Sequence, residues 1–102
     1  MQRFRLKITS RAQRDLLQIR DFIAAEAPET ALEYYDAFLD RIRELGVFPR
    51  RYPIETGIGH RGKEIRSRPI GNYRIIYSVG KGSVHILTVL HGARDRRSGE
   101  RS

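Results

Sequence analysis

The last third of the chain carries a group of side chains that can bind anions. They are Arg66, Arg68, Arg74, His91 and Arg94. An arginine guanidinium stays charged at any working pH and binds a phosphate or a carboxylate through a planar fork of donors. His91 adds a natural general acid or base near the C-terminal end, because imidazole titrates close to neutral pH. Converging arginines would form a clamp for a nucleic-acid backbone or a binding face for an acidic peptide; separate solvated arginines are the third possibility.

Sequence signatures of other site chemistry are missing. The stretch "GIGHRG" has neither the spacing of a dinucleotide fingerprint nor the Lys-Ser/Thr ending of a P-loop. His60, His85 and His91 have no second ligand at a metal-binding spacing, and the chain has no cysteine, so we expect no metal ion and no cofactor. His85 lies inside a predicted strand, and we interpret it as a partly buried structural residue. No serine has the context of an activated nucleophile.

The length of 102 residues fits one domain, which we place at residues 1–95, followed by a basic and disordered tail at residues 96–102. Without cysteine the chain has no disulfide, and the cytoplasm is the expected location. The N-terminus alternates charged and apolar residues, which is unlike a signal peptide, and no window is apolar enough to span a membrane. We therefore expect no membrane partner.

The chain is strongly basic. Twenty Lys and Arg residues against twelve Asp and Glu residues give a formal net charge of +8. A field of this sign favours an acidic partner, whether nucleic acid or an acidic protein segment, through steering and counterion release. A solvated basic surface is the alternative, and composition alone does not distinguish these possibilities.

Hydrophobic periodicity predicts the first two elements that position these side chains. Alternation in "RFRLKITS" indicates a strand over residues 3–9 with one buried and one basic face. Ser10 then occupies an N-cap position. Apolar residues follow at spacings of three and four, which predicts a helix over about residues 11–26.

A second helix follows closely. Pro28 ends the first helical pattern and suits the first turn of the next one. An apolar stripe continues at helical spacing from Glu29 to Leu45, and Gly46 is well placed to end it. Because the link is short, the two helices should form an antiparallel hairpin.

The rest of the chain has strand character after a long loop. Residues 47–63 hold prolines and glycines without a sustained period and are predicted to be a loop. Strands are predicted over "EIRSR", "YRIIYSV" and "VHILTVLH", the last two joined by the hairpin turn "GKGS". Alternation places Tyr73, Ile75 and Tyr77 on the helix-packed face of the sheet. Arg74, Ile76 and Ser78 then lie on an open face.

Four stretches in register resemble the RelE/ParE superfamily of small toxins from bacterial type II toxin-antitoxin modules. They are "FRLKITSRAQRDLLQIRDFI", "LGVFPRRYP", "IRSRPIGNYRIIYSV" and "VHILTVLHGARD", and the likeness extends over about residues 4–95. The resemblance and the periodicity agree on an α+β fold. In it a helical hairpin packs on one face of a small, mainly antiparallel sheet in the order β-α-α-β-β-β.

The superfamily divides by activity. RelE-like members are ribosome-dependent endoribonucleases that use basic residues on the sheet and a tyrosine, or a histidine-tyrosine pair, near the C-terminus. By resemblance Arg66, Arg74 and His91 match the basic positions. However, no tyrosine follows Tyr77, and Gly92 comes directly after His91, so the chain departs from the nuclease pattern.

The stretches "VLHGARD" and "RDLLQIRDFI" look more like the ParE branch, whose members poison DNA gyrase and need no acid-base pair of their own. The resemblance implies a non-enzymatic toxin that inhibits DNA gyrase, causes growth arrest, serves plasmid stabilisation and is neutralised by a ParD-like antitoxin. Arg66, Arg68, Arg74, His91 and Arg94 would then be interface residues. The alternative is a RelE-like endoribonuclease acting on mRNA at the ribosome, with Arg66, Arg74 and His91 as its catalytic residues.

Overall fold

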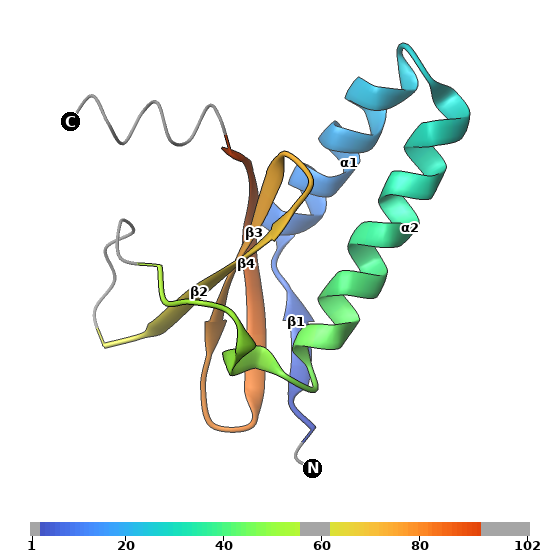
Figure 1. Ribbon diagram of the computed structural model, residues 1–102. Coiled ribbons are helices and arrows are strands. Elements are labelled where there is room, and N and C mark those ends of the chain that lie inside the picture. The colour runs from blue at the N-terminus through green and yellow to red at the C-terminus, as the bar shows by residue number, and fades with distance from the viewer. Residues whose placement is uncertain (1–2, 56–61, 93–102) are drawn as a thin grey trace, which may run out of the picture.

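The computed structural model describes residues 3–55 and 62–92, which form two helices on one side of a four-stranded sheet (Figure 1). The elements are β1 (Arg5–Ile8), α1 (Ser10–Ala24), α2 (Pro28–Leu45), the short 3-10 helix η1 (Pro49–Arg51), β2 (Glu64–Ile70), β3 (Tyr73–Val79) and β4 (Ser83–His91). The sheet order is β1-β4-β3-β2, with β1 parallel to β4 and the other neighbours antiparallel. The predicted fold class and element order are confirmed. None of the helices in the described ranges has the length and apolar character that a membrane crossing requires.

The helix and strand bounds agree with the predicted ones within two residues at each end. The predicted cap of α1 is wrong, because the N-cap is Thr9 and Ser10 is already helical. Thr9 has extended backbone angles, φ −66° and ψ 161°, and its hydroxyl accepts a hydrogen bond from the N–H of Ala12 at 3.1 Å. The same hydroxyl donates to the carbonyl oxygen of Leu87 at 3.0 Å, so one side chain both caps the helix and ties it to β4.

The predicted loop over residues 47–63 has more structure than expected. It contains η1, and Ile54 forms an isolated antiparallel bridge with Arg66 on the outer side of β2. The N–H of Glu55 donates a hydrogen bond to the carbonyl oxygen of Ile65 at 2.8 Å, and the N–H of Ser67 donates one to the carbonyl oxygen of Pro53 at 3.2 Å. These bonds cover part of the edge that β2 would otherwise present to other chains.

The core lies between the helices and the sheet. It contains Ala12, Leu16, Phe38, Ile42 and Leu45 from the helices, and Ile75, Tyr77, Val79, Val84, Ile86 and Val89 from the sheet. The predicted orientation of β3 is confirmed, since Ile75 and Tyr77 are fully buried in this core and Tyr73 packs against it. Burial of one such side chain contributes about 1.5–3 kcal/mol, so this layer is the main stabilising contact between helices and sheet.

A β-bulge interrupts the pairing of β4 with β3. Ile76 pairs with Thr88, and the next residue, Tyr77, pairs with Ile86. Leu87 is therefore the extra residue, with no paired residue on β3. An extra residue on one strand shifts its alternation by one position. Before the bulge the even-numbered residues of β4 face the helices, and after it the odd-numbered residues do.

The bulge decides which face the end of β4 presents to the helices. Strict alternation from Ile86 would turn Leu90 toward the core. Instead Val89 is buried in the core, and His91 pairs with Tyr73 on the same face. The two rings meet edge to face, with centroids 5.1 Å apart and an interplanar angle of 88°. The C-terminal histidine thus belongs to the helix side of the sheet.

Asp15 of α1 holds the strand directly after the bulge. Its carboxylate accepts hydrogen bonds from the hydroxyl of Thr88 and, at 3.1 Å, from the N–H of Val89. Strand β1 pairs only with Ser83 to Ile86, so it offers no partner to the N–H of Val89. The carboxylate of Asp15 satisfies that backbone donor in its place.

The face of the sheet opposite the helices is less open than predicted. Ile65 and Ile76 are each only 1% exposed, although neither belongs to the core beneath the helices. The segment ending at Glu55 pairs with β2, and the Glu55 carboxylate reaches Arg74 on this face. This return of the chain, absent from the alternation pattern, brings the Glu55 side chain onto the face that was predicted to be open.

We expect Asp15→Ala to lower the free energy of unfolding by about 1–3 kcal/mol, because it leaves a backbone donor and a hydroxyl without their acceptor. Urea unfolding followed by circular dichroism measures the change. Asp36→Ala is the matched control, since Asp36 is exposed on α2, and it should change the free energy by less than about 0.5 kcal/mol. Equal effects of the two substitutions would show that Asp15 does not hold β4.

Candidate functional site

The structure does not bring the predicted anion-binding residues together on one face. Arg66 lies opposite Tyr77 and Arg68 lies opposite Ile75, so both arginines project on the helix side of the sheet. Arg74 projects on the other side. His91 is on the helix side but lies at the far end of β4, and Arg94 lies outside the described residues. The predicted convergence of arginines is therefore wrong for the residues that the structure describes.

Arg66 is engaged by groups of the protein itself. Its Nε donates to the Glu64 carboxylate at 2.6 Å, and its Nη1 donates to the carbonyl oxygen of Tyr52 at 2.6 Å. Glu64 also takes a bidentate pair of bonds from Arg50. Burial raises the pKa of Glu64, but the hydrogen bonds from Arg66 and Arg50 and their charges outweigh it and hold the pKa below its usual value. The carboxylate stays ionised between two guanidinium groups, which compensates much of the positive charge of Arg66.

Arg74 is held by Glu55. Its Nη1 lies 2.7 and 2.9 Å from the two carboxylate oxygens, and both side chains are mostly buried. Burial raises the pKa of Glu55, but hydrogen bonds from Arg74 and Ser67 and the charge of Arg74 outweigh it, so the pKa lies below normal. An ion pair of this kind neutralises the arginine that the sequence placed at the centre of a phosphate clamp.

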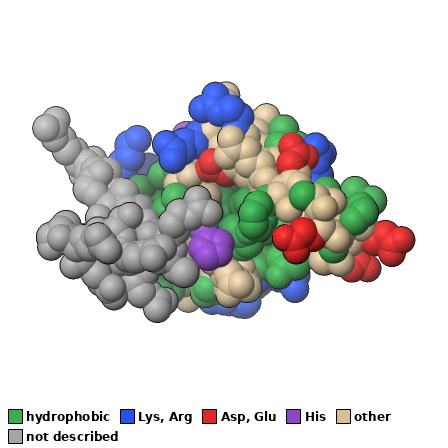
Figure 2. Space-filling view, turned by 90° about the horizontal axis from the view of Figure 1, so that it is seen from above, with side chains coloured by type: hydrophobic (Ala, Val, Ile, Leu, Met, Phe, Trp, Pro, Cys, Tyr) green, Lys and Arg blue, Asp and Glu red, His purple; other side chains and the backbone are tan. Residues whose placement is uncertain are grey.

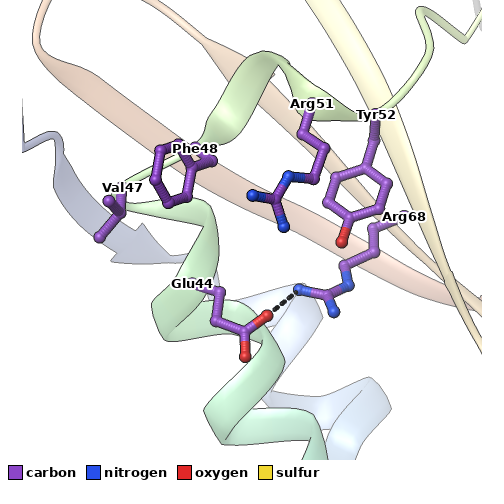
Figure 3. Close-up of a pocket in the computed structure, with 6 residues that line it drawn as sticks. All are labelled: Glu44, Val47, Phe48, Arg51, Tyr52 and Arg68. Carbon is purple, nitrogen blue, oxygen red and sulfur yellow. Dashed lines mark hydrogen bonds and ion pairs between the residues drawn. The ribbon is translucent and has the colours of Figure 1, made fainter.

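Arg68 occupies a different environment, a cavity between the C-terminal end of α2, η1 and β2 (Figure 3). Its Nη1 donates to the carbonyl oxygen of Arg41 at 3.1 Å and to Glu44 at 2.8 Å. Its guanidinium carbon lies 4.8 Å from the centre of the Tyr52 ring. The residue is only 9% exposed, which makes it the one buried charged residue among those described.

His91 and Tyr77 do not form an acid-base pair for cleavage. The Nδ1 atom of His91 is buried and has no hydrogen-bond partner among the described residues, and its ring packs on Tyr73. The hydroxyl of Tyr77 is buried and donates to the carbonyl oxygen of Pro49, and burial raises the pKa of Tyr77 to about 12. A phenol with that pKa stays protonated at neutral pH and cannot serve as a general base.

Exposed hydrophobic side chains offer a second kind of functional surface. The large ones are Leu17, Phe22, Leu32, Phe48 and Ile54. Phe22 and Leu32, 71% and 63% exposed, lie on α1 and α2 close to the turn that joins them. Figure 2 shows hydrophobic side chains at the surface beside basic and acidic ones on the face seen from above. Such a mixed surface suits an amphipathic partner better than a uniform polyanion.

Sequence reasoning missed the carboxylates that engage the arginines, and it missed Arg51 and Tyr52 as neighbours of Arg68. Glu44 and Glu55 are far from their arginine partners along the chain, so no local spacing relates them. The stretch "VFPRRYP" carried the only usable signal, because it places aromatic and basic residues next to each other directly after a helix.

Comparisons with known proteins agree with the fold. The family model described as ParE toxin of type II toxin-antitoxin system, parDE, matches residues 6–96. A chain from a structure of the chromosomal ParDE TA system from P. aeruginosa superposes with a TM-score of 0.69 at 19% identity, covering 86% of this chain and 95% of the other. A chain from the archaeal RelE-RelB complex from Pyrococcus horikoshii OT3 superposes with a TM-score of 0.61 at 22% identity, covering 89% and 97%. No curated protein matches significantly.

The buried phenol of Tyr77 should make stability fall at alkaline pH. An unfolded tyrosine loses its proton near pH 10, whereas the folded group keeps it to about pH 12, so the folded state binds more protons in between. The contribution of Tyr77 is complete below about pH 10, and it is lost at about 1.4 kcal/mol per pH unit up to about pH 12. Tyr77→Phe should remove this part of the slope, as measured by urea unfolding at several pH values. Tyr34→Phe should retain it, and an unchanged slope in Tyr77→Phe would refute the assignment.

Proposed function

Since the chain belongs to the ParE toxin family of type II toxin-antitoxin systems, we propose that it inhibits DNA gyrase by binding it and is neutralised by a cognate, ParD-like antitoxin. It would act in the cytoplasm as a protein ligand and not as an enzyme. The observation that favours gyrase binding over RNA cleavage is that the candidate catalytic side chains already contact other groups of the protein. Arg66 and Arg74 are paired with carboxylates, and His91 packs on an aromatic ring.

RNA cleavage without a metal requires a positioned acid and base and a cation that stabilises the phosphorane-like transition state. Among the described residues, Arg74 has its positive charge compensated by Glu55, on the face opposite His91. Tyr77 is protonated and donates to the backbone. These contacts support binding over cleavage.

The antitoxin proposal rests on family membership, and the surface of the molecule agrees with it. The net charge of +8 favours an acidic partner, and the exposed Phe22 and Leu32 provide apolar area on the helical hairpin. An amphipathic segment with acidic and apolar residues would match both properties. His91 and Arg94 are the predicted interface residues to replace first, and Arg66, Arg68 and Arg74 stay predicted interface residues.

We expect the purified protein, at molar excess, to block supercoiling of relaxed plasmid by gyrase, because binding stops the enzyme's cycle. Gel analysis of plasmid topology measures the effect. His91→Ala and Arg94→Ala should each raise the inhibiting concentration by about threefold to tenfold, the cost of one interface side chain. Arg43→Ala, at an exposed arginine of α2 paired with Asp40, is the control and should inhibit like the wild type. Unaffected supercoiling at toxin excess would refute gyrase as the target.

The same protein should leave translated messages intact during growth arrest. Mapping of transcript ends after expression in cells tests this. Cleavage at the ribosomal A site that disappears in Arg74→Ala with His91→Ala would overturn the proposal in favour of a RelE-like endoribonuclease. Cleavage that persists in this double variant would indicate a nuclease of the host cell. The supercoiling assay would then decide whether gyrase is the target.

A further inference from the structure

A cavity of about 270 Å³ lies where α2, η1 and β2 meet, and of its lining residues the proposed function uses only Arg68, as a predicted interface residue. It is lined by Glu44, Val47, Phe48, Arg51, Tyr52 and Arg68. Figure 3 shows the guanidinium of Arg51 between Phe48 and Tyr52, and the guanidinium of Arg68 below the Tyr52 hydroxyl with one nitrogen bonded to Glu44. The cavity therefore combines donors for an anion with an apolar wall.

Arg68 is preorganised to bind an anion. The side chain is 11% exposed and is held at one end, since Nη1 makes both of its hydrogen bonds, to Arg41 and Glu44. The structure gives its Nε and Nη2 no hydrogen-bond partner within the described ranges. These two atoms form the side-on edge of the guanidinium, which binds a carboxylate through two parallel bonds.

The cavity carries more positive than negative charge. Arg41, Arg51 and Arg68 surround one carboxylate, that of Glu44. The hydrogen bond from Arg68 is the main cause that holds the pKa of Glu44 below its usual value, and the charges of Arg68, Arg41 and Arg51 add to it. Arg51 stacks on the Phe48 ring at 4.7 Å and has no carboxylate partner among the described residues. One further negative group is therefore electrostatically favoured here.

Glu44 indicates the chemical class of the ligand. The Glu44 carboxylate already binds a nitrogen of Arg68, which shows that a carboxylate fits beside this guanidinium. The other oxygen of Glu44 lies 3.7 Å from Nη1 of Arg41, so Glu44 also pairs with a second arginine. A nucleic-acid strand would bring several phosphates toward this resident negative charge. A single carboxylate next to an apolar group would meet the charges of Arg68 and Arg51, and its apolar neighbour would meet Phe48, which is 46% exposed and on which Arg51 stacks.

We propose that this cavity binds an acidic side chain, with its apolar neighbour, from an extended segment of a partner protein. Arg51 and Arg68 supply the positive charges that hold the carboxylate, and the apolar neighbour covers Phe48. The volume suits one or two amino-acid side chains and is below that of most sites for cofactors. The proposal goes beyond gyrase inhibition and does not depend on it, because it names a site for an acidic peptide whatever the target.

The test is an NMR titration of the full chain, labelled with nitrogen-15, with the blocked peptide Ac-Glu-Leu-Glu-NH₂. We expect saturable shifts of the side-chain Nε–H signal of Arg68 and of the backbone signals of Phe48 and Tyr52. The uncharged peptide Ac-Gln-Leu-Gln-NH₂ should bind at least about tenfold more weakly, since it cannot form the charged pair. This titration uses neither gyrase nor DNA, so its failure and the failure of the supercoiling assay are distinguishable.

Matched variants keep the test decisive. Arg51→Gln, at an arginine that pairs with no carboxylate within residues 3–55 and 62–92, and Arg68→Gln should each weaken binding of the acidic peptide about fivefold or more. Arg43→Gln, outside the cavity on the same helix, should stay within about twofold. The proposal is wrong if neither peptide shifts these signals, if both peptides bind equally, or if Arg43→Gln weakens binding as much as Arg51→Gln does. It is also wrong if oligo-dT of about twelve nucleotides binds this cavity more tightly than the acidic peptide.

Discussion

The bulge at Leu87 is the constraint on which the arrangement of the functional side chains depends. Two side chains of the α1 region hold it, because Thr9 donates to the carbonyl oxygen of Leu87 and Asp15 accepts from the N–H of Val89. A one-residue shift in alternation moves every later side chain of the strand to the other face. His91 therefore packs on Tyr73 under the helices and is separated by the sheet from Arg74. The connection of the first helix to the last strand thus determines what the C-terminal residues can do.

The arginines show how a basic chain can lack a phosphate clamp. Arg66, Arg68 and Arg74 each lie at least half buried, and each has a carboxylate within hydrogen-bond distance. Taking a guanidinium out of water without a partner would cost several kcal/mol, which is why buried arginines in proteins are paired. The carboxylates compensate the buried guanidinium charges. They thereby also reduce the positive charge that binding of a nucleic-acid backbone would require. Residual positive charge is left where the cations outnumber the carboxylates, around Glu44 and around Glu64.

Periodicity was enough to predict the helices, the strands and the face of β3 that packs on them. These features depend on residues three, four or two positions apart, and the hydrophobic pattern of Phe38, Ile42 and Leu45 or of Ile75 and Tyr77 expresses them directly. The site was harder to predict. Its geometry depends on the bulge and on ion pairs between residues 19 to 24 positions apart, such as Arg74 with Glu55 and Arg68 with Glu44. Neither a single extra residue in a strand nor a distant carboxylate changes the local pattern of a sequence.

The cap of α1 is a smaller case of the same limit. Thr9 and Ser10 are both good N-cap residues, and the local pattern does not decide between them. The contact that decides is the one from Thr9 to Leu87, 78 positions away along the chain. Because the cap and the bulge share this hydroxyl, the start of the helix and the register of β4 are specified together. The residues that the structure describes pack around one core, so the surface of this part of the chain is positioned by such shared contacts.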